Sequence, residues 1–120
     1  MKKRIAALVL CLALVFALAA CGGESGEKLS FGTGGDSGTY YAFGGALAGY
    51  VTEKTDTAVT AITSSGSQAN IEDIASGAIQ LGFVQSDVMD YAYNGTRLFV
   101  DKDTGESAPV TNFSTVAALY

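Results

Sequence analysis

The 120-residue sequence contains no histidine and no tryptophan, and it has one proline and two cysteines. Without histidine, a Ser-His-Asp triad and a histidine-ligated metal site are both excluded within these residues. Basic residues are also scarce, because seven Lys and Arg face twelve Asp and Glu. A protein that follows a nucleic-acid backbone needs a basic surface. The composition therefore argues against nucleic acid as a partner.

The N-terminus has the three parts of a secretory signal peptide. Lys2, Lys3 and Arg4 form a basic start, residues 5–17 are apolar, and small residues lead to Cys21. A membrane-spanning helix would need about 20 apolar residues, and here glycine and glutamate follow too soon. We therefore expect residues 1–20 to be a signal peptide that is removed on export. Four basic and twelve acidic residues would remain, a net charge of about −8.

The end of this segment, Leu18-Ala19-Ala20-Cys21, resembles the lipobox of bacterial lipoproteins. In that family the cysteine takes a diacylglycerol, the chain is cut before it, and the new N-terminus is acylated. The alternative is a soluble secreted protein with a stray cysteine, but secreted proteins usually avoid an unpaired exposed thiol. The resemblance implies lipidation at Cys21 and an extracytoplasmic protein anchored to the cell membrane. With Cys11 removed, no disulfide can form.

The remainder of the chain alternates between strand and helix patterns. Residues 21–28 are rich in Gly, Ser and Glu and are interpreted as a flexible tether. Strands are predicted at residues 29–32, 59–62 and 79–84, and helices at residues 39–54, 68–76 and 88–94. Strands that alternate with helices of this length indicate βαβ units and a parallel sheet. The predicted fold class is α/β.

Local signals predict where these elements end. In the second helix Ile71, Ile74, Ala75 and Ala78 share one face, and Gly77 should stop it. For the third helix, Ser86 or Asp87 should provide the cap and Asn94-Gly95 should close it.

The C-terminal part of the sequence holds two further predictions. Residues 102–105 indicate a hairpin or an open loop, and the apolar, β-branched residues 113–120 predict a fourth strand. Because that strand would fall at the chain terminus, we expect residues 29–120 to be the N-terminal part of a longer protein. A complete small domain is the alternative.

The loop at residues 32–41, GTGGDSGTYY, is the first candidate for ligand binding. Its spacing does not fit a dinucleotide fingerprint, since Ser37 stands at the sixth position, and no lysine follows as a phosphate loop requires. We therefore expect this loop to bind neither a dinucleotide nor the phosphates of a nucleotide. Its glycines allow close approach to main-chain N–H groups, and a helix predicted to start at Thr39 would favour an anion there. Asp36 opposes this unless it turns away or caps the helix. A tight turn without a ligand is the alternative.

Two further polar loops precede the other predicted helices, at residues 63–67 and 85–87. In a parallel sheet the strand-to-helix loops gather at the carboxyl edge, where ligands bind. Each loop alone could simply cap its helix, but three together favour a small-molecule site. Tyr40 and Tyr41 could add an aromatic wall, although one of them should belong to the core.

Together, GTGGDSGTYYAFGGALA, ITSSGSQANIEDIASGAIQLGFVQSDVMDYAYNG and VAALY resemble the start of the TAXI family of TRAP-transporter solute-binding proteins. The resemblance implies a two-lobed periplasmic-binding-protein fold, of which residues 29–120 would form the N-terminal part of lobe one and the second lobe would be absent. It also implies a non-enzymatic role without a cofactor: binding a small carboxylate-bearing acid or amino acid between the lobes. The partner would be an integral-membrane permease driven by an ion gradient.

The same resemblance assigns ligand-binding residues to the three loops, with no metal and no catalytic residue. They are Gly38, Thr39 and Tyr40 in the first loop, Ser65, Gly66 and Ser67 in the second, and Gln85, Ser86 and Asp87 in the third. The family often has glycine or threonine at positions 36 and 37, which leaves the influence of Asp36 on ligand choice open.

Two other functions fit the same sequence. A ligand-sensing module of a membrane receptor would use the same fold, and a transmembrane segment further along the chain would favour it, whereas a neighbouring permease gene would favour transport. A lipid-anchored enzyme is the third reading, and the lack of histidine and of a tight acid pair argues against it.

Overall fold

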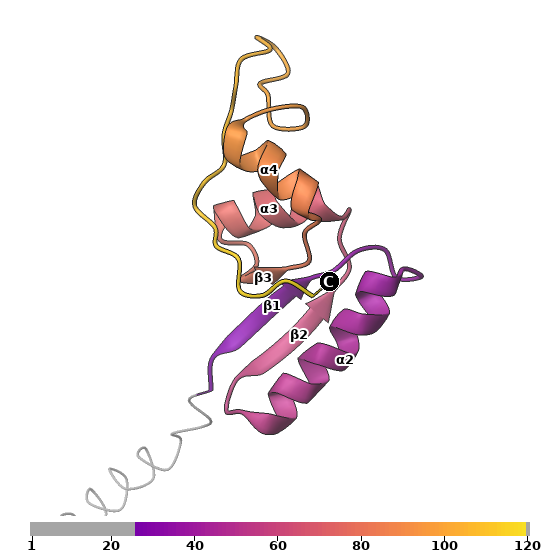
Figure 1. The fold of residues 1–120 in the computed structure, drawn as a ribbon. Helices are drawn as coiled ribbons and strands as arrows, with labels where there is room; N and C mark the ends of the chain where they lie inside the picture. The colour runs from indigo at the N-terminus through magenta and orange to yellow at the C-terminus, as the bar shows by residue number, and fades with distance from the viewer. Residues whose placement is uncertain (1–25, 120) are drawn as a thin grey trace, which may run out of the picture.

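The computed structural model describes residues 26–119 (Figure 1). The predicted signal peptide, the lipidation site at Cys21 and most of the predicted tether lie outside the described residues. Among the residues that are described, no helix is long and apolar enough to cross a membrane.

Three strands alternate with three helices along the chain, as the sequence predicts. They are β1 (Lys28–Gly32), α2 (Thr39–Lys54), β2 (Ala58–Ile62), α3 (Ser67–Ser76), β3 (Leu81–Gly82) and α4 (Ser86–Asn94). All bounds lie within two residues of the predicted ones, although β3 is shortened at both ends and has two residues where six were expected. Lys28, assigned to the tether, is the first residue of β1, because it pairs with Ala58 at the start of β2.

The three strands form one parallel sheet in the order β2-β1-β3. The central strand β1 pairs along its full length with β2, while only Phe31 and Gly32 pair with β3. The α/β class with parallel strands is therefore confirmed. A lobe of the periplasmic-binding type is compatible with this architecture.

The helices cover opposite faces of the sheet (Figure 1). On the α2 face, Phe31 and Phe83 pack with Ala48 of α2, and the two phenylalanine rings lie 4.6 Å apart. On the α3 face, a Cβ added at Gly82 would lie 3.0 Å from the Cβ of Asn70 and 3.2 Å from Ile74. The glycine therefore lets α3 approach the sheet closely.

A second buried cluster lies on the α3 side, away from the sheet. Ile71 of α3 packs with Val88 and Ala92 of α4 and with Phe99 in the segment after α4. Backbone hydrogen bonds hold this segment against the helix, since the N–H of Val110 donates to the carbonyl of Ala92 at 2.8 Å. This cluster fixes the position of α4 and therefore of the loop that precedes it.

The glycines predicted to end α3 and α4 are confirmed, whereas the side-chain cap predicted at the N-terminus of α4 is wrong. Gly77 and Gly95 end α3 and α4 with φ of 80° and 61°, the left-handed conformation that favours glycine. Neither Ser86 nor Asp87 caps α4, because the helix already includes both and its N-cap is Gln85. The Asp87 carboxylate instead accepts the N–H of Val88 at 2.9 Å. Ala78 lies beyond α3 and is exposed, so it does not share the buried face.

Residues 102–105 were predicted to form a hairpin or an open loop. The structure has the hairpin, with a single antiparallel bridge between Val100 and Ser107. The fourth strand predicted at residues 113–120 is wrong for the residues that the structure describes, which form no strand through residue 119. β-branched residues form a strand only where a neighbouring edge offers a ladder, and here side chains hold the segment instead. Asn112 Nδ2 donates to the carbonyl of Ala75 at 2.9 Å, and the Thr115 hydroxyl donates to the Met89 sulfur at 3.2 Å.

Candidate functional site at the carboxyl edge of the sheet

The three strand-to-helix loops lie together at the carboxyl edge, because all three strands run in the same direction. Two hydrogen bonds join one loop to the next. The N–H of Ser64 donates to the carbonyl of Gly34 at 3.0 Å, and the N–H of Gln85 donates to the Ser67 hydroxyl at 3.0 Å. The loops predicted to hold a ligand therefore form one connected surface. Whether their side chains contact a ligand stays a prediction.

The first loop is anchored at its base and open at its tip. Thr33 is fully buried, and its N–H and hydroxyl both donate to the carbonyl of Ile62, at 3.0 and 2.7 Å. Further along, the N–H of Gly38 donates to the carbonyl of Gly35 at 2.9 Å, which closes a tight turn. Asp36 is exposed and does not cap α2, whose N-cap is Gly38.

All three helices begin without a side-chain cap. The N-cap residues are Gly38 for α2, Gly66 for α3 and Gln85 for α4. Among these described residues, none makes a capping hydrogen bond through its side chain. The N–H groups of a first helical turn have no intrahelical partner, and the helix dipole adds partial positive charge there. In α4, however, the Asp87 carboxylate already accepts the first-turn N–H of Val88. The N-termini of α2 and α3 are therefore the helix ends that offer main-chain donors to an anion.

The charges around the loops oppose a highly charged ligand. None of the three loops contains lysine or arginine, while Asp36 and Asp87 are exposed carboxylates within them. A phosphate group would place all of its charge beside these carboxylates without a basic counterpart. A single carboxylate, held by neutral donors, fits the site better.

The nine predicted ligand residues differ in how accessible they are. Five are exposed at the edge, namely Thr39, Ser65, Gln85, Ser86 and Asp87, whereas Gly38, Tyr40, Gly66 and Ser67 are half-buried. The Ser67 hydroxyl accepts the N–H of Gln85, so it also holds the second and third loops together.

The two tyrosines after the first loop have different environments. The Tyr40 ring packs on Phe83 with a centroid distance of 5.2 Å and belongs to the α2-side core, whereas Tyr41 is 37% exposed. This confirms that one of the two tyrosines is a core residue. It is the one that the family resemblance assigned to the ligand.

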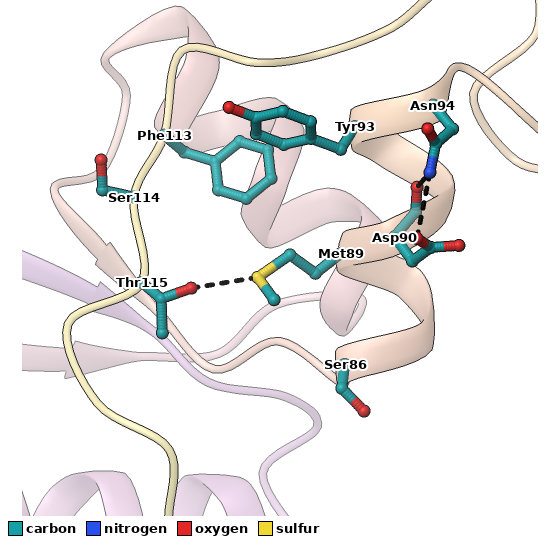
Figure 2. Close-up of a pocket in the computed structure, with 8 residues that line it drawn as sticks. All are labelled: Ser86, Met89, Asp90, Tyr93, Asn94, Phe113, Ser114 and Thr115. Carbon is teal, nitrogen blue, oxygen red and sulfur yellow. Dashed lines mark hydrogen bonds between the residues drawn. The ribbon is translucent and has the colours of Figure 1, made fainter.

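A separate open groove of about 580 Å³ lies between α4 and the segment at residues 113–115 (Figure 2). Tyr93 of α4 meets Phe113 edge-on at 6.0 Å, and Met89 and Thr115 close one side. Only Ser86 belongs both to this groove and to the predicted ligand residues. The hollow in the surface and the cluster of loops are therefore two different places.

The structure also reveals a residue whose role the sequence analysis did not assign. Asn70 of α3 is fully buried, and its side-chain nitrogen donates to the carbonyls of Gly32, Thr33 and Phe83 at 3.2, 3.1 and 2.8 Å. The available signal was a polar residue directly before Ile71, on the buried side of a helix. Only the sheet order shows which strands it joins.

A parallel α/β sheet whose strand-to-helix loops gather along one edge is compatible with part of a solute-binding lobe. Within residues 26–119 no three His, Cys, Asp or Glu side chains are grouped to hold a metal ion. Comparison with known families supports the binding class, because residues 31–120 match the NMT1-like family. This match spans three quarters of the chain, and the chain belongs to that family, which is a family of solute-binding proteins and not of enzymes.

Proposed function

We propose that this protein is an extracytoplasmic solute-binding lipoprotein of the TAXI type. It captures a small organic acid or amino acid and delivers it to the permease of a TRAP-type secondary transporter. The observation that carries the binding part is that the three strand-to-helix loops meet at one sheet edge, where α2 and α3 begin without side-chain caps and without acidic residues in their first turns. The family of the chain supports a solute as ligand. The TAXI-like motifs support the transporter, and Leu18-Ala19-Ala20-Cys21 supports the lipid anchor.

The ligand group at the first loop is a carboxylate. Each hydrogen bond from a neutral donor to a charged group contributes about 1.5–3 kcal/mol, and a helix dipole adds about 0.3–2 kcal/mol. The N-terminus of α2 combines both with an exposed hydroxyl on Thr39. One hydroxyl and one helix end are therefore sufficient to discriminate a carboxylate from its amide.

The test is Thr39→Val in the full-length protein, measured by calorimetry with succinate and L-glutamate and with their amides, succinamate and L-glutamine. Valine keeps the shape of threonine and removes the hydroxyl donor. We expect the affinity for the acid that binds to fall about tenfold, which corresponds to about 1.4 kcal/mol. The discrimination between acid and amide should fall with it.

Thr60→Val is the matched control, because Thr60 is exposed on β2 and lies outside the three loops. It should leave the affinity unchanged. Unchanged affinity and discrimination in Thr39→Val would show that the first loop is a structural turn. If wild-type protein binds none of the four compounds, a small carboxylate of this class is not the ligand.

A further inference from the structure

A buried amide joins β1 and β3, the two neighbouring strands whose following loops lead to opposite faces of the sheet. The loop after β1 leads to α2 on one face of the sheet, and the loop after β3 leads to α4 on the other face. In open α/β sheets ligands bind in the crevice between two such strands, beyond their carboxyl ends. The side chain of Asn70 reaches this point from α3, and no part of it is exposed.

The amide nitrogen of Asn70 binds more carbonyls than it has hydrogens. It donates to Gly32 and Thr33 at the end of β1 and to Phe83 directly after β3. Since an amide NH₂ has two protons, at least one of them is shared between two carbonyl oxygens. The end of β1 and the end of β3 are thus held by one side-chain atom.

The backbone is shaped to admit this side chain. Gly32 and Gly82 are partners in the β1–β3 register, and both lie against Asn70. A Cβ at Gly32 would lie 2.5 Å from Asn70 Oδ1, and one at Gly82 would lie 3.0 Å from Asn70 Cβ. A side chain at position 32 would displace the amide, and one at position 82 would press on the Cβ of Asn70.

The oxygen of the same amide makes no comparable hydrogen bonds. Asn70 Oδ1 is buried and accepts no hydrogen bond from any described residue. A buried acceptor without a donor opposes folding, and the three hydrogen bonds from the same amide offset this cost. All three of these bonds go to the ends of β1 and β3 and none goes to α3 itself, so the amide acts on the strand ends.

We propose that Asn70 is a positioning residue for the ligand site. It fixes the spacing between the first and third loops, and its N–H groups partly neutralise three main-chain carbonyls at the carboxyl ends of β1 and β3. Carbonyl oxygens carry partial negative charge, so without this donor they would repel an anion at the same edge. The fixed spacing is a property of the fold, whereas the favoured anion rests on the function proposed above.

The loop-spacing part is tested by amide hydrogen exchange on the full-length protein, comparing Asn70→Asp and Asn70→Ala with wild type. Four amides report on the loops, because their partners lie in or beside them: Thr33, Ser64, Phe83 and Gln85. We expect exchange at these sites to accelerate at least tenfold, while amides in the middle of α2 keep their protection. Equal acceleration throughout the chain, or no change at the four sites, would refute the positioning role.

Asn112→Asp is the matched control. Asn112 Nδ2 also donates to a backbone carbonyl of α3, but at Ala75 near the opposite end of the helix. This variant should leave the four loop amides unchanged. If it accelerates them as much as the Asn70 variants do, loosening of α3 is the cause, and the specific role of Asn70 is refuted.

The electrostatic part is tested by the ratio of affinities for an acid and its amide, with succinate and succinamate as one pair and L-glutamate and L-glutamine as the other. Asn70→Ala removes the donors, and Asn70→Asp replaces them with a carboxylate. We expect the preference for the acid to fall about threefold in the first variant and tenfold or more in the second. A merely structural role would lower both affinities equally and leave the ratio unchanged.

Hydrogen exchange tests the loop spacing and the affinity ratios test the electrostatic role, so the two parts of the proposal can fail separately. If wild-type protein binds none of these compounds, the proposed function fails for this ligand class and the anion part of the inference fails with it. The exchange measurement then still decides whether Asn70 holds the loops. Should Asn70→Asp fail to fold, Asn70→Ala gives the same comparison, because it removes the donors without introducing a buried charge.

Discussion

Replacing Gly44 with alanine should separate helix propensity from packing at the α2–sheet contact. Gly44 is buried in α2 and faces the base of the first loop. A Cβ at this position would lie 2.5 Å from Thr33 Cγ2 and 3.1 Å from Phe83 Cε2. Both neighbours are themselves buried, and Thr33 is held by two hydrogen bonds to the carbonyl of Ile62. The methyl group can therefore be accommodated only if α2 moves away from the sheet.

The expected magnitude follows from two opposing contributions. Overpacking a dense core costs about 1–3 kcal/mol, whereas alanine in a helix interior is favoured over glycine by about 1 kcal/mol. Gly44→Ala should then lower the free energy of unfolding by up to about 2 kcal/mol. Because Thr33 begins the first loop, the same shift should weaken binding of a carboxylate at Thr39.

Gly45→Ala and Gly49→Ala are the controls, since they lie in the same helix and a Cβ there would have no neighbour within 4 Å. Both should raise the free energy of unfolding by up to about 1 kcal/mol. Urea denaturation of the three variants measures this directly, and subtracting a control from Gly44→Ala isolates the steric contribution. If all three variants stabilise the protein equally, the close contact between α2 and Thr33 is wrong.

Three further outcomes are expected. Cys21→Ser should release the protein from membranes and prevent cleavage to the mature size, and a variant that stays bound would require another anchor. The Asp101 carboxylate accepts hydrogen bonds from the N–H and hydroxyl of Thr104 and from the N–H of Asp103, which lower its pKa below 3.8. Since its pKa is lower in the folded state, the Asp101 carboxylate stabilises the hairpin above pH 3.8, and this stabilisation is lost as the pH falls through the folded-state pKa. An NMR titration of Asp101 should show the lowered pKa, and Asp101→Asn should abolish the pH dependence of the hairpin. Gly66 has φ 95° and ψ −160°, a region almost restricted to glycine, so Gly66→Ala should cost about 1–3 kcal/mol in denaturation experiments, and a neutral result would mean that the loop relaxes.

Sequence patterns were sufficient to predict features that depend only on residues close together in the chain. The glycines at 77 and 95 end their helices because only glycine adopts positive φ without strain, and that property is independent of the fold. The alternation of strands and helices likewise predicted a parallel sheet, and with it the gathering of three loops at one edge. Even so, the caps expected from Ser86 and Asp87 did not form, since α4 starts earlier than its apolar pattern suggested.

Features that depend on a distant partner were beyond the sequence. The apolar residues 113–119 have strand propensity, but a strand needs an edge to pair with, and tertiary contacts hold this segment to α3 and α4 instead. Tyr40 and Tyr41 are chemically equivalent in the sequence, and only the position of Phe83 determines that Tyr40 is the core residue.

The sequence by itself determined the α/β class, the alternating order of strands and helices from β1 to α4, and the three polar loops that meet at one edge. Each of these follows from periodicity and from the conformational limits of single residues. Tertiary structure alone decided that β1 lies between its two neighbours and that Asn70 joins the ends of β1 and β3. The physical reason is that a buried amide takes its partners from strands 13 to 38 residues away in the chain, and only the packed sheet brings those carbonyls together.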